Sequence, residues 1–331
     1  MPVELSLIMP FFNAGRFIAE ALMSIQEQTY SNWELIAIDD FSEDDSLNIL
    51  QKFAAGDARI KIIQNLEKGI IPALNLAFEH CEGQYISRCD ADDIYPNERL
   101  EMMVGRIKSR APKTVITGMV SYFSDKSVSR QLRKHEAWLN EINICGATWS
   151  NVYRNCVIAS PNWLCSKADM QEIGAFKNLE YPENYDLVFK WHKHGFDVEC
   201  IGEISLYWRE HPLRISHLSE DYQQKAFFSL KLKRFLEIEK FSKLYLWGNG
   251  KKAKLCASLL IESGLNFSWM DLESQHSEEK DSIPREDFRF TNLSNGAKLL
   301  IGIYPNPAQR RNIEDFLMGQ NKIEGKDYWY L

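Results

Sequence analysis

The chain has 331 residues, of which 45% are hydrophobic and 26% are charged. At roughly 100–200 residues per domain, this length predicts two or three domains. The apolar content excludes a largely disordered chain. The net charge of −7 provides no global positive field, so we expect no nucleic-acid partner.

Two features of the sequence bear on its location. No apolar run reaches the ~18–20 residues that a membrane-spanning helix needs. The chain begins Met1-Pro2-Val3-Glu4-Leu5 and lacks the basic start and long apolar stretch of a signal peptide. We therefore expect a cytoplasmic protein, with contact at the inner face of a membrane and self-association both left open. The seven cysteines contain no C-x-x-C pair, which favours reduced thiols over disulfides or a zinc site.

Strand and helix signals alternate through the first hundred residues. Short apolar runs predict strands at Leu5–Met9, Trp33–Ile38, Arg59–Gln64 and Tyr85–Arg88, and Pro10 is expected to end the first. Apolar residues at helical spacing follow the first three strands. Repeated strand–helix–strand units imply a parallel α/β sheet, and ligands bind such sheets beyond the carboxyl ends of the strands.

The later parts of the chain differ in character. Beyond residue 112 the pattern is less regular, with a short strand at Thr114–Gly118 and a helix near Asn184–His194. The strand–helix pattern restarts at Lys243, which predicts a small Rossmann-like α/β domain. Its expected strands are Leu244–Trp247, Asn266–Leu272, Lys298–Tyr304 and Tyr328–Leu331. The predicted division is a large α/β domain at 1–218, a connecting helix at 219–242 and the small domain at 243–331.

Three carboxylates, Asp90, Asp92 and Asp93, follow the fourth predicted strand within four residues. Unpaired carboxylates repel one another, so this cluster needs a counter-charge. A divalent cation with oxygen ligands supplies it, and Mg2+ or Mn2+ commonly holds a diphosphate as well. The alternative is a solvated acidic turn or a helix cap beside Pro96-Asn97-Glu98.

Several segments, taken in order, resemble family 2 glycosyltransferases. The resemblance covers about residues 4–218 and includes the family's D-x-D motif at Asp90-Ala91-Asp92. Each segment alone is a weak signal, whereas their shared order and spacing are specific. The similar segments are Leu7–Ala14, Ser24–Tyr30, Glu34–Asp44, Ala73–Ala77, Gly83–Asp93, Pro96–Leu100, Pro161–Trp163 and Tyr181–Leu187.

The resemblance implies a glycosyltransferase-A fold and transfer from a nucleotide sugar, usually with inversion at the anomeric carbon. Asp39 would accept a hydrogen bond from the base imide, which suits uracil; the alternative is a helix-capping turn residue. Asp92 would be the principal metal ligand, Asp90 would face the ribose or the metal, and Asp93 would orient ligands. Pro10, Phe11 and Phe12 would line the base pocket, and Asn13, Asn75 and Ala91 are further candidate donor contacts. The leaving diphosphate gains negative charge, which Lys68, Arg88 and Arg209 could offset; a surface role is the alternative for each.

The expected general base departs from the family pattern. The family commonly shows Glu-Asp-Tyr-Asp, whereas this chain has Glu183-Asn184-Tyr185-Asp186. Asn184 is no useful proton acceptor. Three explanations remain: Glu183 or Asp186 serves as the base, the alignment with the family is shifted, or the enzyme is impaired. Between the two carboxylates, Asp186 is slightly preferred because Glu183 suits the start of a helix.

The segment Trp208–His217 is rich in hydrogen-bond donors and contains Pro212. In similar enzymes a mobile segment here closes on the diphosphate, and a histidine completes metal coordination. His211 is the candidate ligand, and Arg214 could approach the diphosphate. The alternative for each is a solvated surface residue.

A rival fingerprint begins the small domain. Gly248-Asn249-Gly250-Lys251-Lys252-Ala253 fits G-x-G-x-x-A, and Asp271 follows at about the distance of a ribose contact. These glycines also suit a close strand–helix turn.

The leading hypothesis is therefore a glycosyltransferase dependent on Mn2+ or Mg2+. It would use a nucleotide sugar, with UDP favoured, and a saccharide or lipid-linked acceptor of surface polysaccharide synthesis. The alternatives are an NAD-like nucleotide-dependent oxidoreductase or sensor centred on Gly248, and a non-catalytic sugar-nucleotide-binding protein, suggested by Asn184.

Overall fold

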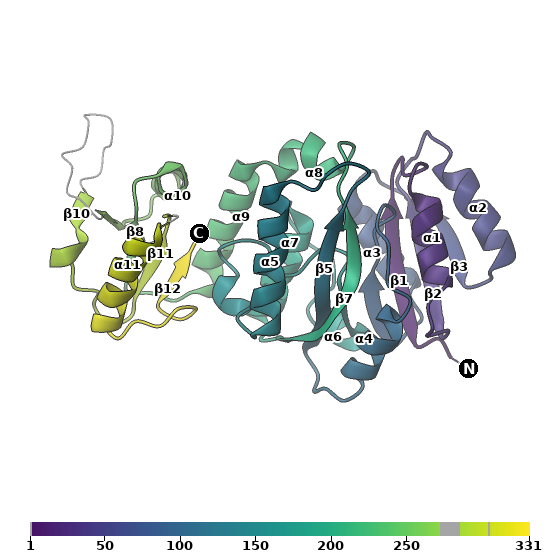
Figure 1. The fold of residues 1–331 in the computed structure, drawn as a ribbon, viewed down its shortest axis with the longest axis horizontal. Coiled ribbons are helices and arrows are strands. Elements are labelled where there is room, and N and C mark those ends of the chain that lie inside the picture. The colour runs from purple at the N-terminus through teal and green to yellow at the C-terminus, as the bar shows by residue number, and fades with distance from the viewer. Residues whose placement is uncertain (1, 272–284, 304) are drawn as a thin grey trace. The chain divides into compact units, whose positions relative to one another are not determined.

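The computed structural model describes residues 2–271, 285–303 and 305–331. The chain divides into two compact units, drawn in Figure 1. The first unit contains residues 1–148 and 157–218, and the second contains residues 149–156 and 219–331. The short segment 149–156 therefore groups with the C-terminal part of the chain.

A seven-stranded sheet forms the centre of the first unit, in the order β3-β2-β1-β4-β6-β5-β7. Neighbouring strands are parallel except at β6, which runs antiparallel to both β4 and β5. Six strands therefore end at the same edge of the sheet. The strands are β1 (Leu5–Phe11), β2 (Trp33–Asp39), β3 (Ile60–Gln64), β4 (Tyr85–Arg88), β5 (Thr114–Phe123), β6 (Trp163–Ser166) and β7 (Asp197–Arg209).

Helices pack on this sheet. α3 contacts β1 and β2, α4 contacts β5, β6 and β7, and α5 contacts β5 and β7. The helices of the first unit are α1 (Ile18–Gln26), α2 (Ser46–Gly56), α3 (Ile70–His80), α4 (Arg99–Ile107), α5 (Arg130–Ile144), α6 (Lys167–Glu172), α7 (Glu183–Lys193) and α8 (Ile215–Leu218).

The central strands are buried along most of their length. All seven residues of β2 are buried, which explains why its sequence reads as a nearly continuous apolar run. The expectation that Pro10 ends the first strand is wrong, because β1 continues to Phe11 and Pro10 pairs with Ile38. Pro10 lies beyond Ile8, the last residue paired with β4, so no ladder bond on that side requires its missing N–H.

The second unit contains a five-stranded, fully parallel sheet in the order β10-β9-β8-β11-β12. Strand β10 (Arg285–Asp287) was not expected from its charged sequence. Leu272 and Tyr304, the last residues of two expected strands, lie outside the described residues. The remaining elements are β8 (Lys243–Trp247), α10 (Lys251–Glu262), β9 (Ser268–Asp271), η3 (Phe288–Phe290), β11 (Ala297–Ile301), α11 (Pro307–Gly319) and β12 (Tyr328–Tyr330).

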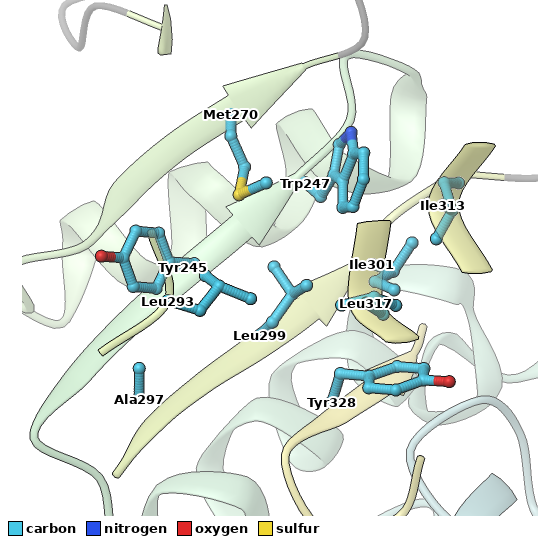
Figure 2. Close-up of a cluster of buried hydrophobic side chains, with 10 residues drawn as sticks. All are labelled: Tyr245, Trp247, Met270, Leu293, Ala297, Leu299, Ile301, Ile313, Leu317 and Tyr328. Atoms are coloured by element: carbon cyan, nitrogen blue, oxygen red, sulfur yellow. The ribbon is translucent and has the colours of Figure 1, made fainter. Parts of the chain in front are cut away.

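An apolar cluster between the sheet and α11 forms one core of the second unit (Figure 2). Ile313 and Leu317 of α11 face the strands in this cluster. On the α10 side, helix and sheet approach closely: a Cβ on Gly302 would lie 2.8 Å from the Ala253 Cα. Gly248 has a φ of 120°, and a Cβ there would lie 2.5 Å from Ile303 Cγ1. Close packing therefore leaves no room for a side chain at either glycine.

The expected connecting helix at 219–242 is shorter than predicted and is interrupted. A 3-10 turn, η2 (Glu220–Tyr222), precedes α9 (Gln224–Ile238), and Gln223 between them is extended with φ −78° and ψ 160°. α9 packs against α10 and so belongs to the second unit. Among the described residues, no helix is both long enough and apolar enough to cross a membrane.

Lys231 of α9 is buried in the second unit, with 4% of its surface exposed. Its Nζ donates to the Arg154 carbonyl at 3.1 Å and lies 4.4 Å from the Phe228 ring. Burial, with a smaller contribution from the charge of Lys252, lowers the pKa of Lys231 to about 7. Near neutral pH the folded protein therefore holds a proton on this amine less tightly than the unfolded chain does.

This burial predicts a pH-dependent cost to stability. Because the folded-state pKa lies below the unfolded value, the native state binds fewer protons between these two values. Lys231→Met should therefore stabilise the protein most near pH 6, and the gain should shrink as pH rises toward 10. Denaturant unfolding across this range measures the difference, with the exposed Lys225→Met as control. A gain that is constant with pH would show that Lys231 has an ordinary pKa.

Candidate functional site

Most of the predicted site residues lie at or just after the carboxyl ends of β1, β2, β3, β4 and β7, which are parallel and end at one edge of the first sheet. The others lie on α3 and at the start of α7. At this edge Phe11 is in register with Asp39, and the Cys89 N–H donates to the Ile8 carbonyl at 2.9 Å. The loops after β2 and β4 thus flank the loop after β1. Open α/β sheets bind ligands at this edge.

Asp90, Asp92 and Asp93 gather their carboxylates directly after β4. One oxygen from each side chain lies within 4.8 Å of those from the other two. Asp93 Oδ1 accepts from the Arg209 N–H at 2.8 Å, while its buried Oδ2 has no hydrogen-bond partner among the described residues. Three clustered carboxylates, one of which has an orphaned buried oxygen, fit a hard divalent cation such as Mg2+ or Mn2+.

The groups around the three carboxylates offset their mutual repulsion only in part. Burial and the charge of Asp92 raise the pKa of Asp93 well above its usual value. Burial also raises the pKa of Asp90, although Arg88 opposes it. Asp92 differs: burial acts to raise its pKa, but the hydrogen bond with His211 and the charge of Arg214 lower it overall. A bound cation would relieve the remaining repulsion.

Arg88 ends β4 between two carboxylates. Its Nε donates to Asp90 Oδ1 at 2.8 Å, and its Nη1 donates to Glu183 Oε1 at 3.0 Å. Burial disfavours the guanidinium charge, but Asp90 and Glu183 outweigh it and raise the pKa of Arg88. Arg88, proposed from sequence to contact the donor, is thus engaged with protein groups on two sides.

Arg209 ends β7 and contacts the acidic loop from the other direction. In addition to the Asp93 contact of its N–H, its Nε donates to the Asp92 carbonyl at 2.7 Å. Its guanidinium lies 5.0 Å from the Phe17 ring centroid and 4.5 Å from that of Phe123. Arg209 therefore fixes the backbone of the loop that carries the carboxylates.

The segment after β7 also lies against the cluster. A ring nitrogen of His211, Nε2, is 2.9 Å from Asp92 Oδ2, and the ring lies 4.3 Å from that of Phe17. The other nitrogen, Nδ1, is buried with no hydrogen-bond partner in the described parts of the chain. Arg214 donates from Nη1 to the Arg209 carbonyl at 2.8 Å and lies 5.3 Å from the Trp208 ring. The structure thus brings His211 to Asp92, as the metal-ligand hypothesis requires.

Hydrogen bonds connect the loops after β1 and β2. The Asn13 N–H donates to Ser42 Oγ at 3.1 Å, and Asn13 Oδ1 accepts from the Glu43 N–H at 2.8 Å. Asp39 is 2% exposed, and its Oδ1 accepts from the Ser42 N–H at 3.0 Å. Asp39 therefore makes the contact expected of a turn residue at a helix cap, the alternative to a base-binding role. Only one of its two oxygens makes this contact.

The loop after β3 joins the same edge. Asp40 Oδ1 accepts from the Gly69 N–H at 2.8 Å and from Asn65 Nδ2 at 2.7 Å. The Lys68 Nζ lies 5.1 Å from the Phe12 ring centroid. Lys68 and Phe12, both predicted from sequence as donor contacts, are thus brought together.

The remaining predicted donor residues are more enclosed. Phe11 and Ala91 are buried and Pro10 is half-buried. Asn75 donates from Nδ2 to the Phe176 carbonyl at 3.3 Å, which ties α3 to the loop before α7. The contacts of Asn75 thus lie within the protein.

The base candidates lie at the start of α7. Glu183 is 2% exposed and forms the ion pair with Arg88 described above. Asp186 is 3% exposed, and its Oδ2 accepts from the Glu180 N–H at 2.8 Å. Asn184, at the position where the family commonly has aspartate, donates from Nδ2 to a backbone carbonyl at 3.1 Å.

Two contributors to the site were missed in the sequence. Phe17 lies beneath both His211 and Arg209, but its place on the apolar face of a predicted helix concealed this role. Asp40 organises the loop after β3, and its only signal was the doubled aspartate at the end of the second strand.

Comparison with known proteins shows what part of the chain is similar to. Residues 6–164 match the model of "Glycosyl transferase family 2". The chain is 39% identical over 100 residues to an Escherichia coli enzyme, UDP-Glc:alpha-D-GlcNAc-diphosphoundecaprenol beta-1,3-glucosyltransferase WfgD, covering 30% of this chain and 39% of that one. It is 30% identical over 119 residues to the glycosyltransferase GlyG of Streptococcus pneumoniae, covering 36% and 40%. The matches thus span less than half the length of either relative.

Solved structures share the fold at low identity. S. aureus TarS 1–349 in complex with UDP-GlcNAc aligns with a TM-score of 0.55 and 18% identity, covering 78% of this chain and 71% of that one. The mannosyltransferase PcManGT from Pyrobaculum calidifontis, in complex with GDP-Man and Mn2+, aligns with a TM-score of 0.53 and 17% identity, covering 71% and 64%. These likenesses confirm the predicted glycosyltransferase-A type of α/β fold with a mostly parallel sheet.

The buried position of Arg209 predicts a large structural effect of its removal. Arg209 also pairs with Glu20 and lies 3.9 Å from Asp125. Arg209→Met removes a buried guanidinium that lies against the Phe17 and Phe123 rings, and it takes this donor from the Asp92 carbonyl. We expect a loss of about 2 kcal/mol in unfolding free energy, measured by denaturant titration. Arg16→Met is the control, because Arg16 pairs with the same Asp125 at an exposed position and should cost less than about 1 kcal/mol. Equal effects of the two substitutions would contradict a central role for Arg209.

Proposed function

We propose that this chain, whose residues 6–164 form a glycosyl transferase family 2 domain, transfers a sugar from UDP to a saccharide or lipid-linked acceptor. The observation that carries the proposal is the Asp90–Asp92–Asp93 cluster with His211 at the ligand-binding edge of the sheet. The UDP-GlcNAc bound to TarS and the UDP-Glc in the name of WfgD support a UDP-sugar donor. The diphosphoundecaprenol in the name of WfgD further supports a lipid-linked acceptor.

The donor would lie across the ends of β1, β2 and β4. Asp39 is proposed to accept from the uracil imide through Oδ2, the oxygen that the Ser42 N–H does not contact. Lys68 and Arg214 supply positive charge for phosphate oxygens, because neither is paired with a carboxylate in the described residues. Arg209 instead acts by holding the acidic loop.

Asp92, Asp90 and His211 would hold a divalent cation, with Asp93 next to them. When bound, this cation supplies positive charge that stabilises the diphosphate as it leaves. Asp92 suits the role of principal ligand because its pKa is lowered, which keeps its carboxylate ionised.

Transfer is proposed to occur by a single inverting displacement. The acceptor hydroxyl oxygen forms a bond to the anomeric carbon as the bond from that carbon to the diphosphate oxygen breaks. UDP leaves with the electron pair, and the acceptor proton passes to a carboxylate. Asp186 is the proposed proton acceptor, because Glu183 is already paired with Arg88.

Donor binding can be tested without knowledge of the acceptor. UDP with Mn2+ should raise the melting temperature, since a ligand at 100 times its Kd adds about 2.7 kcal/mol of stability. A chelator should abolish the shift, and Asp92→Asn should greatly reduce it, while exposed Asp45→Asn should leave it unchanged. A UDP-sugar hydrolysis screen with Mn2+ then identifies the sugar. Stabilisation by NAD in place of UDP would contradict the proposal.

If Asp186 is the base, Asp186→Asn should impair transfer but not donor binding, in contrast to Asp92→Asn. This variant should lose transfer by about 10²–10⁴-fold, because it removes only the proton acceptor. Its binding of UDP with Mn2+ should match that of the unmodified protein in calorimetry. Full transfer activity in this variant would eliminate Asp186 as the base.

A second candidate function is favoured by the topology of the C-terminal unit. The strand order β10-β9-β8-β11-β12 equals that of the first five strands of a doubly wound dinucleotide-binding sheet, which supports a Rossmann-like description. Asp271 ends β9, where the ribose contact of such folds lies. An oxidoreductase or sensor would require NAD binding that is lost in Gly250→Val. A non-catalytic binding protein, in contrast, would bind UDP-sugars without hydrolysis or transfer.

A further inference from the structure

We infer that Glu183 is a positioning residue of the candidate metal centre: it holds Arg88, and Arg88 in turn holds Asp90. This inference rests on the proposed function, and it removes Glu183 from the candidates for the base. The three side chains form a continuous chain of contacts from the first residue of α7 to the carboxylate cluster.

The geometry supports a bridging role for Arg88. Nε and Nη1 of one planar guanidinium contact Asp90 at 2.8 Å and Glu183 at 3.0 Å. Because the two nitrogens belong to one rigid group, fixing one contact restricts the other. The side chains of Arg88 and Glu183 are only 7% and 2% exposed, so water competes little for these bonds. The orientation of Asp90 therefore depends on Glu183.

The charge balance indicates why the contacts from Glu183 through Arg88 to Asp90 are needed. Asp90 is close to Asp92, whose negative charge disfavours its ionised form. Arg88 opposes this effect, but a buried guanidinium paired only with Asp90 would satisfy fewer of its donors. Glu183 accepts one of the remaining N–H groups and keeps the guanidinium in place. Without Glu183, Arg88 would be free to turn away from Asp90.

The same contacts argue against proton transfer to Glu183. A proton on its carboxylate would abolish the charge attraction that orients Arg88. If Glu183 were the base, each proton transfer would therefore disturb the position of Asp90. A fixed carboxylate instead links α7, which also carries Asp186, to the loop after β4. The donor side and the proposed base are thereby held in one arrangement.

Equilibrium binding distinguishes a positioning residue from a base. Calorimetry with UDP and Mn2+ on the full chain should show about tenfold weaker binding for Glu183→Gln, as for other groups that orient metal ligands. The Mn2+ concentration for half-saturation should rise correspondingly. Arg88→Lys keeps the positive charge but loses the rigid bridge, so it should show the same loss. The double variant should be no weaker than either single one, because all three break one chain of contacts.

Glu172→Gln is the matched control, because this carboxylate of α6 pairs with Lys113 at an exposed position and should leave UDP binding unchanged. Unchanged UDP and Mn2+ binding in Glu183→Gln, with transfer abolished, would overturn the inference and restore Glu183 as the base. If that variant does not fold, unchanged binding in Arg88→Lys overturns it equally. Absence of UDP binding by the unmodified protein would instead refute the proposed function.

Discussion

The repulsion among Asp90, Asp92 and Asp93 is the constraint on which the rest of the site depends. Three carboxylates in four residues persist beside a buried strand only because positive and hydrogen-bonding groups surround them. Arg88 approaches from β4, while Arg209 and its neighbours approach from the end of β7. None of these groups neutralises the cluster fully, since the pKa values of Asp90 and Asp93 are raised. The proposed divalent cation would supply the positive charge that these groups leave missing.

This constraint also explains the long-range architecture of the first unit. The loop after β4 and the end of β7 are more than one hundred residues apart in sequence, yet the Arg209 N–H donates directly to Asp93. The parallel arrangement of β4, β5 and β7 places their carboxyl ends at one edge, so these segments can meet there. Phe17 of the loop before α1 completes the contact by packing under Arg209 and His211. The aspartate loop therefore holds together segments from β1 to β7.

The sequence predicted most strands of the first sheet because its buried parallel strands are mostly apolar, and Tyr85–Arg88 was identified to the residue. Prediction was wrong where tertiary context decides. Pro10 continues β1 since no ladder bond requires its N–H on one side, and the charged strand Arg285–Asp287 gave no apolar signal. The D-x-D motif located the acidic centre. The partners of Glu183 and Asn75 were inaccessible to sequence patterns, because they depend on contacts with distant segments.

The glycines of the second unit show how a fold can imitate a functional fingerprint. Gly248 has a positive φ and no room for a Cβ beside Ile303, while Ala253 packs against Gly302. Small residues at these two positions are thus needed for strand and helix to meet, whatever the unit binds. Only Gly250 lacks such a reason, because a Cβ there would meet nothing within 4 Å. The argument for a nucleotide in this unit therefore depends on Gly250 and Asp271, whereas the acidic centre of the first unit is supported by several independent contacts.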